Sequence, residues 1–152
     1  MEIPDESSAG AMQTFNPMFA KIHQEMRNDS IMTGKKLSNP YITLADFVIK
    51  LQIGQGTFGK VYLAQLPNLS KKFAIKVIRK DKLIETGAID STALEKDILF
   101  EADHPFLCGM EYFFQSETRL YFVLPFIGGG ELFKIVKKRK ILDESVVKFY
   151  AA

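Results

Sequence analysis

The pattern of hydrophobic and polar positions divides the chain near residue 40. Residues 1–40 carry scattered Ser, Asn, Gly and Pro without strand alternation, and residues 35–40 are typical of a linker. Five apolar side chains within this part recur at helical spacing: Phe15, Met18, Phe19, Ile22 and Met26. They predict a short helix packed on the main domain, with a membrane or partner helix as the alternative. We therefore expect residues 1–40 to be a flexible extension that contains this helix.

From Tyr41 the pattern changes to short β-rich runs. Three of them, at residues 47–54, 60–66 and 71–79, are joined by connections that suit antiparallel hairpins. A helix is expected next over residues 93–100, with its N-terminal cap in residues 90–92, and it should end before His104.

Two further strands are predicted at residues 107–115 and 119–127. The second is apolar enough to be buried on both faces and should be the core strand. Glycines 128–130 interrupt it, and helices should begin at Glu131 and Asp143. The order predicts an α+β fold with a five-stranded antiparallel sheet and one main helix.

Charge and cysteine content exclude several classes of protein. The 20 basic and 18 acidic side chains of the 152 residues leave a net charge of +2, which is not typical of nucleic-acid binders or polybasic membrane proteins. No apolar run is long enough to span a membrane, and the first residues do not resemble a secretion signal. Cys108 has no partner for a disulfide bond, so we expect an intracellular location in the cytoplasm, with the nucleus as the alternative.

A glycine-rich segment lies between the first two predicted strands. It reads GQGTFGKV from Gly54 to Val61, and a dinucleotide-binding turn would instead lie between a strand and a helix. Glycines at a hairpin tip let backbone N–H groups approach phosphate oxygens, and Val61 could cover a flat base. A glycine-bulged hairpin without a ligand is the alternative.

The next strand and helix supply two charged candidates. Ala74 leaves room for a purine, and Lys76 is long enough to reach phosphates. Glu95, nineteen residues later on the predicted helix, can pair with that ammonium. Each residue alone would be an ordinary surface residue, but the three features occur together and in order.

These motifs resemble the protein kinase catalytic domain, of the serine/threonine group that contains cyclic-nucleotide-dependent kinases, protein kinase C and Akt-like kinases. The resemblance covers residues 47–152 and rests on GQGTFGKV, FAIKVIRKDK, LEKDIL, HPFL, LYFVLPFIGGGELF and FYAA. It implies a kinase small lobe over residues 41–127, followed by a hinge exit and the start of the larger lobe over residues 128–152.

The resemblance also implies roles for individual residues in binding ATP. The phosphates would be covered by Gly54, Gln55, Gly56, Thr57, Phe58 and Gly59, and the adenine by Ile53, Val61 and Ala74. The ammonium of Lys76 would form an ion pair with the carboxylate of Glu95. Leu124 is similar to the gatekeeper, the Pro125 carbonyl and the Ile127 N–H would bind the adenine edge, and Glu131 would meet ribose and a substrate arginine. For Glu131 a capping carboxylate in a helix is an equal alternative.

The sequence lacks the H-R-D and D-F-G motifs that supply the catalytic and metal-binding aspartates of kinases. We therefore expect that the chain alone does not transfer phosphate, and that the protein ligands of Mg²⁺ lie in the rest of the larger lobe. Expected partners are ATP and protein substrates with basic residues near the Ser or Thr. The alternatives are a non-catalytic module that binds a scaffold or another kinase through a groove beside the Glu95 helix, and an unstable product without activity.

Overall fold

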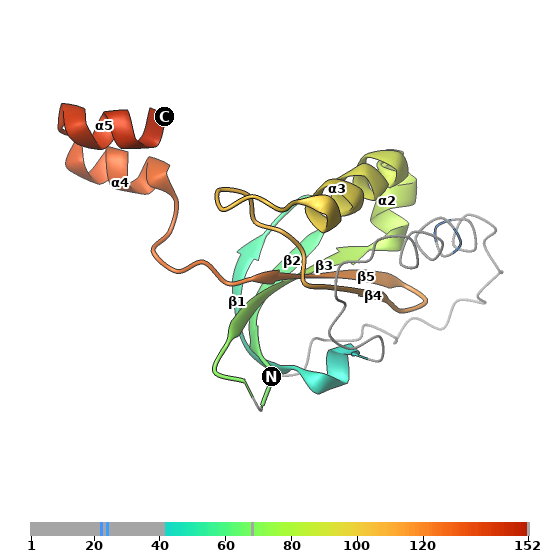
Figure 1. Ribbon diagram of the computed structural model, residues 1–152. Helices are drawn as coiled ribbons and strands as arrows, with labels where there is room; N and C mark the ends of the chain where they lie inside the picture. The colour runs from blue at the N-terminus through green and yellow to red at the C-terminus, as the bar shows by residue number, and fades with distance from the viewer. Residues whose placement is uncertain (1–21, 23, 25–41, 68, 152) are drawn as a thin grey trace.

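The computed structural model describes residues 22, 24, 42–67 and 69–151. Figure 1 shows these elements in chain order: the 3-10 helix η2 (Leu44–Asp46), β1 (Val48–Gln55), β2 (Gly59–Gln65), β3 (Lys72–Arg79), α2 (Lys80–Thr86), α3 (Ile89–Glu101), β4 (Tyr112–Gln115), β5 (Arg119–Pro125), α4 (Leu132–Arg139) and α5 (Glu144–Ala151). Of the predicted N-terminal helix, Ile22 is described and helical, and its other predicted members lie outside the described residues.

The five strands form one antiparallel sheet in the order β1-β2-β3-β5-β4. The β-branched and aromatic residues of these segments favour extended backbone, and segments rich in Gly or containing Pro supply turns. β5 lies between two strands and its central residues 120–123 are buried, as predicted for a core strand. The predicted α+β fold with a five-stranded sheet is confirmed.

The sheet buries apolar side chains on both faces because successive residues of a strand point to opposite sides. One face carries the outer cluster, which we define as Phe47, Tyr62, Ala64, Phe73, Ile75, Val77, Tyr112, Tyr121 and Val123. The other face, with α2 and α3, carries the helix-side cluster, defined as Ile22, Ile78, Leu83, Met110, Leu120 and Phe122. Lys76 lies on this second face.

One prediction about the helices was wrong, and one helix was missed. Residues 90–92 do not cap α3 but lie inside its first turn, where the hydroxyls of Ser91 and Thr92 donate to the Ala88 carbonyl at 3.0 and 2.8 Å. Inside a helix, a Ser or Thr hydroxyl can donate to the backbone carbonyl three or four residues earlier. These residues therefore do not always mark the start of a helix. The sequence analysis also missed α2, a short helix that ends at Gly87 in the left-handed conformation (φ 66°).

The strand predicted over residues 107–115 is shorter than expected. Only β4 is a strand, because the backbone before it is used in turns: the Leu107 N–H donates to the His104 carbonyl, and the Met110 N–H to the Leu99 carbonyl at 2.7 Å. Residues 107–110 therefore belong to the turns that follow α3 and not to a strand of the sheet.

The helices predicted after the glycines are present as α4 and α5. Figure 1 shows them beyond β5, apart from the sheet, at the end of an extended connection. Among the helices that the structure describes, none is long and apolar enough to cross a membrane.

Candidate functional site

An ion pair joins the sheet to α3. The Nζ atom of Lys76 in β3 lies 2.7 Å from Oε1 of Glu95 in α3. The two side chains are 33% and 42% exposed, so the pair is open to solvent on one side. The Lys76 ammonium also lies 5.9 Å from the centre of the Phe122 ring, within the range of a cation–π contact. The two contacts fix the ammonium between strand and helix and leave it accessible.

Two of the apolar residues predicted to cover a base, Val61 and Ala74, lie on the same face as Lys76. Val61 is directly opposite Lys76 across β2 and β3, and Ala74 is opposite Leu124 across β3 and β5. Because residues two apart in a strand share a face, Ala74 and Lys76 project to the same side. The register therefore brings Val61, Ala74, Lys76 and Leu124 together. Ile53 precedes Gly54, at an irregularity in the pairing of β1 with β2.

The glycine loop between β1 and β2 is anchored at both ends. The Gly56 N–H donates to the Gly59 carbonyl at 2.8 Å, and the Arg79 N–H donates to the Phe58 carbonyl at 3.0 Å. Phe58 packs against the helix-side cluster. The loop of Gln55, Gly56, Thr57, Phe58 and Gly59 is thus held near the end of β3.

The glycines of this loop have different surroundings. A Cβ on Gly59 would lie 1.8 Å from the Val77 carbonyl oxygen, so β2 and β3 approach too closely for a side chain. A Cβ on Gly56 would meet nothing within 4 Å, and one on Gly54 would make ordinary contact with Val61. Gly59 is therefore required by the sheet, whereas the bare backbone at Gly56 borders open space.

A cavity of about 210 Å³ lies beside the loop. Loop residues and four cationic side chains line it: Lys60, Arg79, Lys82 and Arg119. It also contains Val77, so it opens on the face opposite Lys76, because residues 76 and 77 point to opposite sides. The cavity is therefore separate from the Lys76–Glu95 pair.

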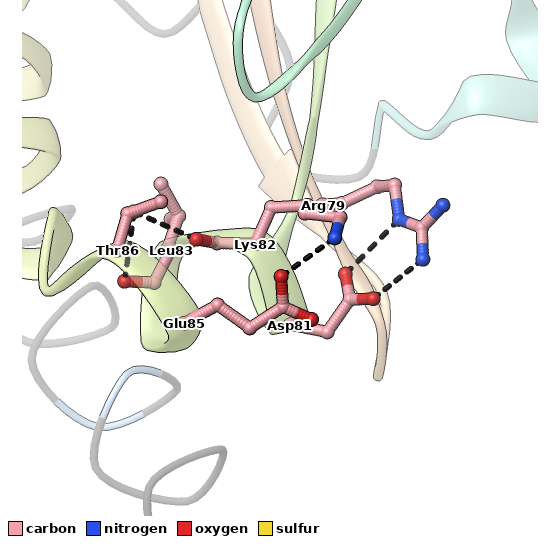
Figure 2. A network of polar contacts seen from close by, with 6 residues as sticks. All are labelled: Arg79, Asp81, Lys82, Leu83, Glu85 and Thr86. Carbon is pink, nitrogen blue, oxygen red and sulfur yellow. Dashed lines mark hydrogen bonds and ion pairs between the residues drawn. The ribbon is translucent and has the colours of Figure 1, made fainter.

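Two carboxylates of α2, Asp81 and Glu85, accompany two of these cations (Figure 2). Arg79 Nε donates to Asp81 Oδ1 at 3.0 Å, and Lys82 pairs with Glu85 at 2.6 Å. The hydrogen bond from Arg79 lowers the pKa of the Asp81 carboxyl below its usual value. The network ties the end of β3 to the first turns of α2, whose Thr86 hydroxyl donates to the Lys82 carbonyl.

The segment after β5 contains the remaining predicted residues. Pro125 ends β5 opposite Phe73, and the next residue, Phe126, donates its N–H to the Lys72 carbonyl at 3.0 Å. Ile127 is exposed. Glu131 precedes α4, and its carboxylate makes an ion pair of 3.2 Å with Lys134 rather than a hydrogen bond that caps the helix.

Sequence reasoning missed two side chains, Phe122 beside the site and Lys80 in the interior of the lobe. Phe122 faces the Lys76 ammonium, and the alternation of β5 could have shown this, because Phe122 is two residues before Leu124. Lys80 is 1% exposed and donates to the Gln115 side chain at 2.9 Å and to the Ser116 carbonyl at 2.8 Å. Lys80 stands in a charged run, Arg79 to Lys82, that is typical of an exposed surface.

Comparison with known proteins decides the family of the chain. Residues 47–152 match the family model described as the protein kinase domain. The chain belongs to the protein kinase family. Its kinase relatives include a probable serine/threonine-protein kinase of Dictyostelium discoideum, 42% identical over 117 residues, which are 77% of this chain and 25% of that protein.

Two other relatives belong to the predicted group. The RAC serine/threonine-protein kinase of Drosophila melanogaster is 37% identical over 73% of this chain and 18% of its own length. Protein kinase C-like 1B of Caenorhabditis elegans is 35% identical over 81% of this chain and 18% of its own length. The predicted resemblance to serine/threonine kinases of this group is confirmed, and the chain spans a quarter or less of these relatives.

Protein kinases use ATP with Mg²⁺, and the residues of this lobe fit the nucleotide. The accessible Lys76 ammonium and the apolar residues Val61, Ala74 and Leu124 on its face are a suitable phosphate and base surface. In the described part of the chain, no three His, Cys, Asp or Glu side chains cluster as metal ligands. The described part of the lobe thus offers donors to a nucleotide and no cluster of side chains for Mg²⁺.

Proposed function

We propose that this chain is the ATP-binding part of a serine/threonine protein kinase, which transfers the γ-phosphate of ATP to protein hydroxyls. The observation that carries the proposal is the 2.7 Å pair of Lys76 with Glu95 on the sheet face that also presents Val61, Ala74 and Leu124. In kinases this lysine binds the α- and β-phosphates and the glutamate orients it.

The residues would act by binding and orientation. The ammonium of Lys76 would neutralise phosphate oxygens, and Glu95 would hold it in place. The glycine loop (Gly54 to Gly59) would offer backbone N–H groups to the phosphates, with Gln55, Thr57 and Phe58 shaping its tip. Ile53, Val61 and Ala74 would cover the adenine, and the Pro125 carbonyl and Ile127 N–H would bind its edge beside Leu124. When bound, Mg²⁺ supplies further charge neutralisation to the phosphates.

The catalytic and metal-binding aspartates of the family have no counterpart in residues 1–152. We therefore propose that these residues alone bind nucleotide without transferring phosphate. The proposed division is a small lobe over residues 41–127 and the first part of the larger lobe over residues 128–152. The exposed carboxylate of Glu131 supports the proposal that the substrates are proteins with basic residues near the Ser or Thr. The single Cys108 supports the proposal of an intracellular location in the cytoplasm, with the nucleus as the alternative.

Thermal shift with Mg-ATP tests nucleotide binding. A nucleotide concentration of ten times Kd stabilises the folded chain by about 1.4 kcal/mol, which raises Tm by about 3 °C or more. We expect this rise in the unmodified chain and its loss in Lys76→Ala. The matched control is Lys72→Ala, which removes an exposed lysine at the start of the same strand and should keep the rise. A rise that persists in Lys76→Ala would contradict the proposal.

A second candidate is a non-catalytic module that binds a scaffold or another kinase. Leu94 and Ile98, one turn apart on α3, are 59% and 57% exposed and form an apolar stripe beside Glu95. A cooperative melt with no response to Mg-ATP would favour this candidate.

A further inference from the structure

A row of four side chains crosses the sheet on the face of the candidate site. Each member is directly opposite the next in the register of β2, β3, β5 and β4, in the order Val61, Lys76, Phe122 and Phe113. Side chains that are directly opposite each other in antiparallel strands are close neighbours on one face. The row therefore places an aromatic ring beside the Lys76 ammonium, whose Nζ atom lies over the Phe122 ring, 5.9 Å from its centre.

The ring of Phe122 is confined by its surroundings. The side chain is 0% exposed, and the Phe113 ring meets it edge to face, with ring centres 5.6 Å apart and planes at 66°. This arrangement is favourable because the positive edge of one ring lies against the negative face of the other. Since the interior of a protein is closely packed, a ring buried in this way has little freedom to turn.

The second ring of the pair also carries a cation. The Nζ atom of Lys96 lies over the Phe113 ring, 5.7 Å from its centre, and the Lys96 side chain is 4% exposed. Lys96 follows Glu95 directly in α3, so two consecutive residues of this helix contact the row. Each ring of the aromatic pair thus carries one lysine ammonium.

The ion pair with Glu95 is a weak constraint on Lys76 by itself. Both side chains are partly exposed, and water and salt screen the attraction between charges that are open to solvent. An ammonium over an aromatic face is attracted by the negative charge density of the ring, and this attraction is of similar size to an exposed ion pair. The ring of Phe122 therefore adds a second contact of comparable strength to the same ammonium.

We propose that Phe122 is a positioning residue for Lys76, whose ring, confined by Phe113, keeps the ammonium on the face of Val61 and Ala74 before ATP binds. A lysine side chain that is already held in place loses less conformational freedom when the phosphates arrive, so ATP binds more tightly. The contact stands on the strand register and the ring distance. Its effect on nucleotide binding rests on the proposed function.

NMR of the nucleotide-free chain tests the contact. The side-chain CH₂ signal next to the Lys76 ammonium is assigned in a chain with isotope-labelled lysine by its loss in Lys76→Arg. We expect its protons to lie upfield of those of Lys72, an exposed lysine of the same strand, because the ring current of an aromatic face shifts protons over it upfield. This shift should disappear in Phe122→Leu and persist in Phe47→Leu, which removes a buried ring from the outer cluster. The same Lys76 signal in Phe122→Leu and in the unmodified chain would overturn the proposal.

The affinity for Mg-ATP, measured by titration calorimetry, tests the consequence of the contact. Phe122→Leu should weaken binding by about threefold to tenfold, whereas Phe47→Leu should leave the affinity unchanged. Replacing Phe122 by a ring-trifluorinated phenylalanine keeps a ring of nearly the same size and withdraws negative charge from its face. We expect this replacement to weaken binding as well, although a role in packing alone would be unaffected.

The fluorinated ring also decides the outcome if Phe122→Leu does not fold. An unchanged affinity for Mg-ATP with the fluorinated ring would overturn the positioning role. If the unmodified chain does not bind Mg-ATP, the proposed function fails, and the NMR shift still decides whether the Phe122 ring holds Lys76.

Discussion

Gly56 and Gly59 are three residues apart in the same loop but face different constraints. The Cβ of an alanine at position 59 would overlap the Val77 carbonyl oxygen, whereas the Cβ of an alanine at position 56 would enter open space. We predict that Gly59→Ala destabilises the fold by about 2 kcal/mol, because the clash is with backbone. We predict that Gly56→Ala changes stability by less than about 0.5 kcal/mol. Denaturant unfolding of both variants measures this difference.

The same two variants separate folding from binding. Gly56→Ala should keep the stability of the lobe and weaken its response to Mg-ATP, because the added methyl group hinders the approach of phosphates to the loop backbone. Equal nucleotide responses in Gly56→Ala and the unmodified chain would show that the loop does not approach phosphate at this position.

Lys80 has a lowered pKa because it is buried. Burial brings the pKa of Lys80 from 10.5 down to about 8, and the negative charge of Glu117 partly opposes the change. The unfolded chain therefore binds more protons than the folded chain between about pH 8 and 10.5, so this group makes stability rise with pH across that window.

A Lys80→Met variant reveals this pH dependence by comparison. We predict that, between pH 8 and pH 10, the unmodified chain gains about 2 kcal/mol of stability relative to the variant. Tm measured at several pH values for both proteins gives the difference. A difference in stability that stays constant between pH 8 and pH 10 would show that Lys80 has the same pKa in the folded and the unfolded chain.

Helix α3 is joined to β3 by the pair of Glu95 with Lys76. Partly exposed ion pairs contribute about 0 to 1 kcal/mol to stability, so the pair contributes little to holding the helix in place. We predict that Glu95→Gln lowers Tm by no more than a few degrees but removes most of the response to Mg-ATP, because Lys76 loses the group that orients it. Glu85→Gln, which removes a carboxylate of α2, is the control. A large loss of Tm with an intact nucleotide response would assign Glu95 a structural role.

The strands could be predicted more fully than the helices. Alternation and β-branched residues identified the β1, β2, β3 and β5 segments, because these features act within a few neighbouring residues. The start of α3 and the existence of α2 could not be obtained in this way. Asp90 to Thr92 have the composition of a cap, and only the chain fold places them inside the helix. Lys80 looks like a surface residue until Gln115 of β4 and Ser116 of the following turn accept its hydrogen bonds.

The part of the site that lies within a single strand could be predicted from the sequence. Ala74 and Lys76 share a face because they are two apart in one strand, which the sequence already shows. The pairing of Val61 with Lys76 and of Ala74 with Leu124 depends on hairpin register and on the position of β5, and pattern alone specifies neither. Similarly, helical spacing suggested that Ile22 packs inward, but its neighbours come from β3, α2 and β5.

The position of β5 beside β3 has a consequence for folding kinetics. β1, β2 and β3 are consecutive hairpins, so their contacts are local in sequence and form quickly. The pairing of Arg79 with Arg119 instead closes a loop that contains α2, α3 and β4. Closing this loop costs chain entropy before its contacts are gained. We therefore expect the β1–β3 meander to form first, with α3 the last part to lock into the sheet and the first to exchange its amide protons.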